Sequence, residues 1–198
     1  MGLRAPISRR HGLALALWTA TGLGGALLPG RPAHAGAQRE EPLANAVRTV
    51  LSAAIANAAP PRPTFASFEQ RQGYEQWMSR ASNRLQKRKP EAQVREEFLQ
   101  TVWYEATRAG LDPTLVLGLI EVESGFRKYA ISSAGARGYM QVMPFWTRAI
   151  GDGDASRLFH MQTNLRFGCV ILRHYLNIEQ GNLYLALGRY NGSRGRAE

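Results

Sequence analysis

The sequence predicts a mainly α-helical protein with at most a small β-hairpin region. Apolar residues recur at helical spacing in several segments, most clearly Val94, Phe98 and Val102 within residues 91–110. Asp112 followed by Pro113 is a strong helix start, because aspartate caps helices and proline favours the first helical position. The Gly- and Ser-rich stretch 129–144 has little helical period, so we expect the hairpin there.

The same signals place the remaining helices in order along the chain. The Ala-rich segment before Pro60 favours one helix, and Pro90 ends another that reads as exposed and amphipathic. Asn164 is interpreted as the N-terminal cap of a later helix, which Gly181 ends. Residues 151–160, before that helix, are interpreted as a loop. The expected helices span residues 42–59, 67–89, 91–110, 113–124, 144–150, 164–180 and 182–190.

The first 35 residues predict an export signal rather than part of the fold. Three early arginines precede an apolar stretch at 13–28, and Ala33-His34-Ala35 has the small-x-small form of a signal-peptidase site. We expect cleavage after Ala35 and location in the periplasm or cell envelope. The alternative is a membrane anchor, which the short and Gly-rich apolar stretch disfavours.

The charge of the chain indicates the class of partner, and its cysteine and histidine content limits the disulfides and metal sites it can form. The formal net charge is +10, and four of the arginines lie in the leader. A basic surface suits an anionic cell-wall polymer or membrane surface, whereas an exported protein rarely meets nucleic acid. Cys169 is the only cysteine, so no intrachain disulfide can form, and its helical context predicts a buried apolar residue. His160 and His174 lack metal-site spacing, so we expect no metal and no cofactor.

Two acids end an otherwise apolar helix at residues 113–124. The negative end of the helix dipole and apolar surroundings both favour the protonated form of Glu123, which a general acid requires. Glu121 lies two residues earlier, about 200° round the helix, so the two acids do not form a catalytic pair. Periodicity alone favours the plainer interpretation, an exposed terminal glutamate.

Four sequence blocks around and after this glutamate overturn that interpretation. They resemble the signature of the soluble-type lytic transglycosylases, a helical family related to goose-type lysozyme, and the resemblance covers about residues 95 to 195. The resemblance implies a lysozyme-like catalytic domain at residues 91–198. The helical patterns before it, outside the resemblance, predict an N-terminal helical extension at 36–90. The blocks are Glu123-Ser124-Gly125-Phe126, Ser132-Ser133-Ala134-Gly135-Ala136, Gly138-Tyr139-Met140-Gln141 and Ala186-Leu187-Gly188-Arg189-Tyr190-Asn191-Gly192.

The resemblance implies catalysis by Glu123 alone. It would protonate the oxygen between N-acetylmuramic acid and N-acetylglucosamine, and then act as base on the muramoyl C6 hydroxyl to give a 1,6-anhydro sugar. This chemistry explains the missing second acid, because an ordinary glycosidase needs two carboxylates. The alternatives are a muramidase that admits water to the same bond and a non-catalytic peptidoglycan-binding factor of the envelope.

Four further residues acquire roles from the resemblance. Ser132 is expected near the substrate N-acetyl group, Gln141 to hydrogen-bond sugar, Met143 to form an apolar floor, and Tyr190 to hold the rotamer of the catalytic carboxyl. Tyr139 departs from the usual leucine of the family. We expect a monomer that acts on peptidoglycan glycan strands, with envelope assembly proteins as further candidate partners.

Two glycines of these blocks are expected to have a backbone role rather than a binding role. Gly135 and Gly138 are expected to allow close backbone approach, because "GARG" neither follows a strand nor matches a phosphate loop.

Overall fold

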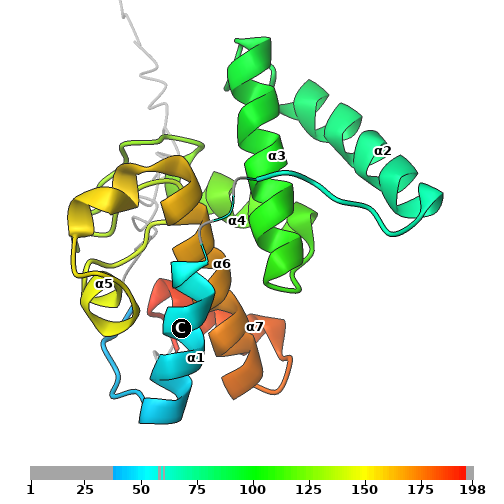
Figure 1. The fold of residues 1–198 in the computed structure, drawn as a ribbon. Helices are drawn as coiled ribbons and strands as arrows, with labels where there is room; N and C mark the ends of the chain where they lie inside the picture. Colours follow the sequence, from blue (N-terminus) through cyan, green and yellow to red (C-terminus); the bar gives the residue numbers. More distant parts are fainter. Residues whose placement is uncertain (1–37, 58, 60, 195–198) are drawn as a thin grey trace, which may run out of the picture. The chain divides into compact units, whose positions relative to one another are not determined.

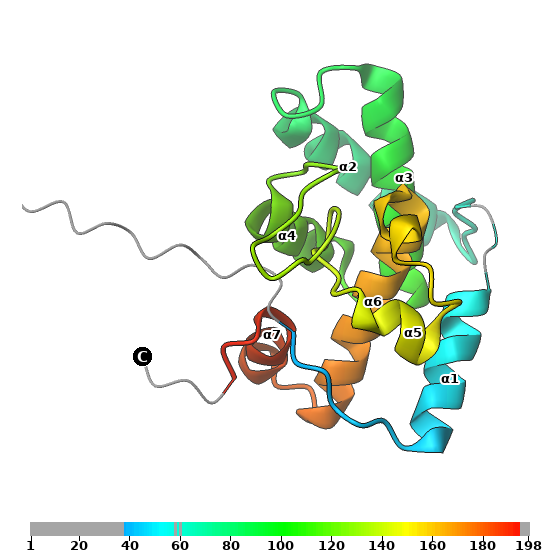
Figure 2. The same cartoon turned by 90° about the vertical axis from the view of Figure 1, so that its left-hand side faces the viewer.

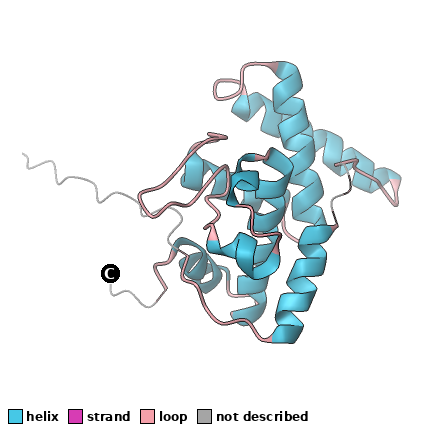
Figure 3. Cartoon of the chain, turned by 60° about the vertical axis from the view of Figure 1, so that its left-hand side comes forward, coloured by secondary structure: helices cyan, strands magenta, loops and turns pink. Residues whose placement is uncertain are grey.

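The computed structural model describes residues 38–57, 59 and 61–194, and the predicted signal peptide lies outside them (Figure 1). The described chain is almost entirely helix and loop, and no strand forms in it (Figure 3). All the predicted helices are present, several with shifted ends. Their bounds are α1 Asn45–Ala56, α2 Phe68–Leu85, α3 Ala92–Arg108, α4 Pro113–Ser124, α5 Phe145–Ile150, the 3-10 helix η1 Ala155–Phe159, α6 Met161–Ile178 and α7 Leu183–Asn191.

Helix α6 lies at the centre of the packing. It contacts α3, α7, η1 and α1, while α2 and α4 both pack against α3 (Figures 1 and 2). The core is built where α3 and α6 meet, from the fully buried side chains of Phe98, Leu99, Leu165, Ile171 and Leu172. No helix of the described chain combines the length and apolar character that crossing a membrane requires.

The limits of α4 follow its sequence signals. The Asp112 carboxylate accepts a hydrogen bond from the Thr114 amide at 2.7 Å, and Pro113 occupies the first turn, as predicted. The helix ends at Gly125, whose φ of +56° is a left-handed conformation that glycine adopts without steric cost. Glu123 is thereby fixed in the last turn of a helix of which one half is buried, and it belongs to that half.

Three expectations differ from the structure. Residues 129–144 form only two isolated antiparallel bridges, Ile131 with Arg137 and Arg137 with Val142, so the hairpin is not confirmed. The loop expected at 151–160 contains η1, since the Asp154 carboxylate accepts a hydrogen bond from the Ser156 amide and starts a short helix. Asn164 does not cap α6, which begins three residues earlier after His160.

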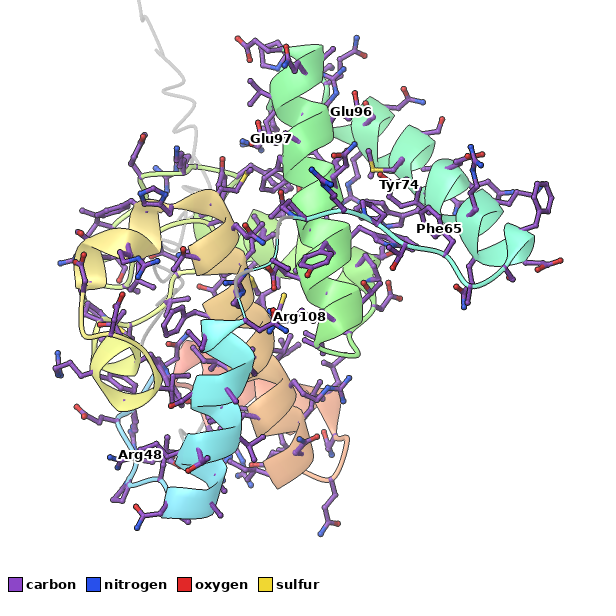
Figure 4. All side chains as sticks on the ribbon, in the orientation of Figure 1. Arg48, Phe65, Tyr74, Glu96, Glu97 and Arg108 are labelled. Carbon is purple, nitrogen blue, oxygen red and sulfur yellow. The ribbon has the colours of Figure 1, made fainter. Side chains whose placement is uncertain are left out.

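The N-terminal extension is attached to α3 and α6 by aromatic and polar contacts. Tyr74 of α2 lies against Phe65 and Trp103, each with ring centroids 5.1 Å from its own, and Figure 4 shows Phe65 on the segment that leads into α2. Arg108 of α3 donates to the carbonyl of Ala54 in α1. The extension therefore packs directly on the helices that carry the core.

Candidate functional site

Glu123 is a buried carboxyl in the last turn of α4. Its residue is 5% exposed, and Ile120, one turn earlier, is fully buried. Glu121 has different surroundings, because its carboxylate pairs with Arg84 at 2.8 Å and stays partly exposed. The two acids of the helix end therefore do not share one environment, in agreement with the helical geometry predicted from the sequence.

The loop that follows α4 is held by its own hydrogen bonds. The Ser132 hydroxyl oxygen accepts from the Ala136 amide at 3.1 Å, and the Ser132 amide donates to the Ala136 carbonyl at 3.0 Å. The Gln141 side-chain nitrogen donates to the carbonyls of Ala130 at 3.2 Å and Gly138 at 2.9 Å. Ser132 thus shapes a tight turn, and the 1% exposed Gln141 closes the loop on itself.

Asn164 of α6 holds the same loop in place with side-chain hydrogen bonds. Its side chain accepts from the Met140 amide at 2.8 Å and donates to the carbonyls of Arg137 and Leu158 at 2.8 and 2.9 Å. A Cβ atom at Gly138 would lie 2.4 Å from the Asn164 amide nitrogen, so the close approach predicted for Gly138 is confirmed. Gly135 faces open space, and its φ of +86°, not close packing, accounts for glycine there.

Tyr190 of α7 joins Glu123 to this loop. Burial raises the pKa of the Tyr190 phenol well above its ordinary value, and the charge of the nearby Glu123 raises it further. The Tyr190 hydroxyl donates to the Met140 carbonyl at 2.7 Å. The end of α4, the 138–141 turn and α7 therefore meet around one buried carboxyl.

Met143 follows the 138–141 turn and contacts Gln38, a residue that no sequence pattern marks as part of the site. Its side chain packs against the core, and its amide donates to the side-chain oxygen of Gln38 at 3.2 Å. The Gln38 side-chain nitrogen in turn donates to the Gln141 carbonyl at 3.3 Å. The structure thus brings Glu123, Gln141, Met143 and Tyr190 into one region.

Tyr139, the departure from the family pattern, is paired with the extension. The Lys89 ammonium donates to the Tyr139 hydroxyl at 2.9 Å and lies 4.6 Å from the centroid of the Phe98 ring. Burial lowers the pKa of Lys89 and raises that of Tyr139 to about 12. The hydroxyl at position 139 therefore serves as the acceptor for a buried cation rather than as part of an open pocket.

Replacing Tyr139 with phenylalanine is expected to lower the free energy of unfolding by about 1–2 kcal/mol. The ring is kept, but the buried Lys89 ammonium loses its acceptor. Urea denaturation measures the effect, and Tyr129→Phe, which alters an exposed ring, is the matched control. A Tyr139→Phe protein as stable as the control would show that the bond to Lys89 contributes nothing.

Among the described residues, neither the cysteine nor any cluster of acids and histidines provides a second reactive centre. Cys169 is fully buried and burial raises the pKa of its thiol, which is the opposite of what a nucleophilic cysteine requires. Within the described residues, no group of three or more His, Cys, Asp or Glu side chains could hold a metal ion. A hollow of about 690 Å³ between α1, α3 and α6 is lined mainly by apolar residues and does not include Glu123.

Comparison with known proteins decides the family. The model of the transglycosylase SLT domain matches residues 100–198, half of the chain. The chain belongs to the transglycosylase SLT domain family. The match contains Glu123 and all four supporting residues predicted from the sequence. It begins within α3, so the whole N-terminal extension lies before it.

Individual proteins that resemble this chain support its assignment to the transglycosylase SLT domain family. A membrane-bound lytic murein transglycosylase C of Actinobacillus pleuropneumoniae is 40% identical over 94 residues, which cover 47% of this chain and 24% of that protein. The corresponding protein of Glaesserella parasuis is 39% identical over 98 residues, 46% of this chain and 24% of its own length. A transglycosylase of Enterobacteria phage PRD1 is 30% identical over 101 residues, 51% of this chain and 37% of its own. The aligned part is therefore about a quarter of each bacterial relative.

Proposed function

We propose that the protein is a peptidoglycan lytic transglycosylase and that Glu123 is its catalytic acid and base. The observation that carries this proposal is the placement of the buried Glu123 carboxyl at the end of α4, beside Tyr190 and the 138–141 turn. The family match and the names of the relatives support the same reaction class.

The absence of a nearby second acid in the sequence favours this reaction over an ordinary two-carboxylate mechanism. No aspartate or glutamate occurs between Glu123 and Asp152. Asp152 pairs with Arg157, and Asp154 accepts hydrogen bonds from Ser156, so both carboxylates are engaged in an exposed turn. A reaction in which the substrate supplies its own nucleophile needs only one protein carboxyl.

In the proposed reaction, Glu123 first gives its proton to the glycosidic oxygen, and the bond between that oxygen and muramoyl C1 breaks. The C6 hydroxyl of the same muramoyl residue then attacks C1, and Glu123 takes the proton released from that hydroxyl. The products are a 1,6-anhydromuramoyl end and a free N-acetylglucosamine end, and the protein returns to its starting protonation state.

Tyr190 is proposed to act on Glu123 as a positioning residue. Because its hydroxyl proton is given to the Met140 carbonyl, the phenolic oxygen can meet the carboxyl only as an acceptor. An acceptor favours the protonated carboxyl over the carboxylate. We propose that Tyr190 holds Glu123 in the proton-donating form in this way.

The other three residues are proposed to form the substrate side of the site. Both N–H groups of Gln141 are directed to loop carbonyls, so its side-chain oxygen is the group left for a sugar hydroxyl. The Ser132 hydroxyl accepts from Ala136 and keeps its own proton to donate to an N-acetyl carbonyl. Met143 contributes the apolar surface beside them.

The site is proposed to work in the periplasm or cell envelope, on glycan strands, as a monomer and with envelope assembly proteins as further candidate partners. The division into a signal peptide at 1–35, an extension at 36–90 and a catalytic domain at 91–198 remains a prediction. The basic charge of the chain, +10 in total, suits the anionic cell wall.

Digestion of purified sacculi tests the proposed function. Mass spectrometry of the soluble products is expected to show muropeptides that end in 1,6-anhydro-N-acetylmuramic acid. Muropeptides with reducing muramoyl ends would identify a hydrolase instead, and intact sacculi would identify a non-catalytic binder.

A further inference from the structure

Gln38 is buried within the candidate site, although the loop residues to which it bonds are 103 and 105 positions away in sequence. Its residue is 4% exposed. Its side-chain oxygen accepts from the Met143 amide at 3.2 Å, and its nitrogen donates to the Gln141 carbonyl at 3.3 Å. A hydrogen bond with the Gln38 side chain also lowers the pKa of Tyr190, against the stronger effect of burial. Gln38 therefore touches the loop and the tyrosine that surround Glu123.

Between Gln38 and Leu43, which packs against the core, the segment is held by exposed ion pairs. We call residues 38–43, which precede α1, the N-terminal strap. Glu40 lies 3.8 Å from Arg148, and both side chains are 63% exposed, so solvent screens the pair strongly. Glu41 pairs with Arg189 at 3.0 Å and is half exposed. A hollow of about 360 Å³ lies between the strap, α1 and α5.

The two hydrogen bonds of Gln38 to the loop indicate which chemical group could bind the Met143 amide and the Gln141 carbonyl in its place. A backbone N–H and a backbone carbonyl, two residues apart, receive the oxygen and the nitrogen of one amide group. The acetamido group of an N-acetylated sugar offers the same pair, a carbonyl acceptor and an N–H donor. Peptidoglycan glycan carries an acetamido group on every sugar, so the side chain and the proposed substrate present the same chemistry to the loop.

We propose that the N-terminal strap is an intramolecular occupant of the glycan site, in which Gln38 takes the place of a substrate acetamido group. This inference rests on the proposed function for the nature of the glycan. The strap must leave the Met143 amide and the Gln141 carbonyl before an acetamido group can bind them. The exposed ion pairs of Glu40 and Glu41 allow this exchange at small cost, and the bound strap lowers the affinity of the site for glycan.

Glycan affinity tests the strap without requiring bond cleavage. Binding of an N-acetylglucosamine tetramer is measured by calorimetry for the protein and for Gln38→Ala. Loss of two hydrogen bonds that compete with the ligand is expected to strengthen binding roughly tenfold in the variant. Unchanged or weaker binding by Gln38→Ala, in protein that unfolds at the same temperature, would overturn the proposal.

A second variant and a control separate the strap from other causes. Gln38→Glu keeps the side-chain shape but cannot donate to the Gln141 carbonyl, so its affinity is expected to rise as well. Gln76→Ala removes an exposed glutamine of α2 and is expected to bind the tetramer as the original protein does. Tighter tetramer binding by the Gln38 variants, with no digestion of sacculi, would support the strap and refute the proposed reaction. Digestion of sacculi with unchanged tetramer binding would support the reaction and refute the strap.

Discussion

Glu123→Gln is expected to lower the rate of glycan cleavage by at least about a thousandfold, because the amide can neither donate a proton to the glycosidic oxygen nor take one from the C6 hydroxyl. The substitution keeps the size of a side chain that is 5% exposed, so the surrounding core needs no repacking. Release of soluble muropeptides from labelled sacculi measures the rate.

The matched control for this variant is two residues away. Glu121→Gln changes the same residue type on the same helix, but Glu121 pairs with the exposed Arg84 at the surface. Its cleavage rate is expected to stay within about twofold of the original, since an exposed ion pair contributes little. Equal loss of activity in both variants, or none in Glu123→Gln, would remove Glu123 from its proposed role.

The second large effect is expected at Asn164. Asn164→Ala leaves the Met140 amide and the Leu158 carbonyl buried without their partner, whereas the Arg137 carbonyl keeps its hydrogen bond from the Val142 amide. Each such group costs about 1–3 kcal/mol, so we expect the free energy of unfolding to fall by about 3 kcal/mol. The loop that carries Gln141 and the Tyr190 acceptor should also lose its fixed position, and cleavage should slow in protein that remains folded.

Urea denaturation measures the stability loss at Asn164, and Asn177→Ala is its control. Asn177 lies on the same helix but is exposed, so its replacement is expected to change stability by less than about 0.5 kcal/mol. If Asn164→Ala matched this control in both stability and cleavage rate, the hydrogen bonds of Asn164 would not stabilise the protein or position the 138–141 turn.

The helices could be predicted because their signals are local. The period of apolar residues in α3, the Asp112-Pro113 start and the Gly125 end of α4 depend on neighbours within one or two turns. The same logic failed at Asn164. An asparagine before an apolar period is typical of a cap, but α6 starts earlier and the side chain points to a loop 24 residues away in sequence.

The candidate site was predictable only in part. Periodicity favoured an exposed Glu123, and the resemblance of the four blocks to the transglycosylase signature corrected this. That resemblance marks a site whose parts are distant in sequence. Gln38 and Lys89 carry no such mark. Gln38 bonds to residues 103 and 105 positions away, and Lys89 to one 50 positions away. No local pattern specifies contacts that form only when the extension packs on the catalytic region.

The most direct test of the account is digestion of sacculi in ¹⁸O-labelled water, followed by mass spectrometry of the muramoyl ends. Attack by the C6 hydroxyl under control of Glu123 predicts ends that are one water lighter than hydrolysis products and contain no ¹⁸O. Reducing muramoyl ends that carry one ¹⁸O atom would show that water is the nucleophile, and would contradict the proposal that Glu123 returns its proton through the substrate's own hydroxyl.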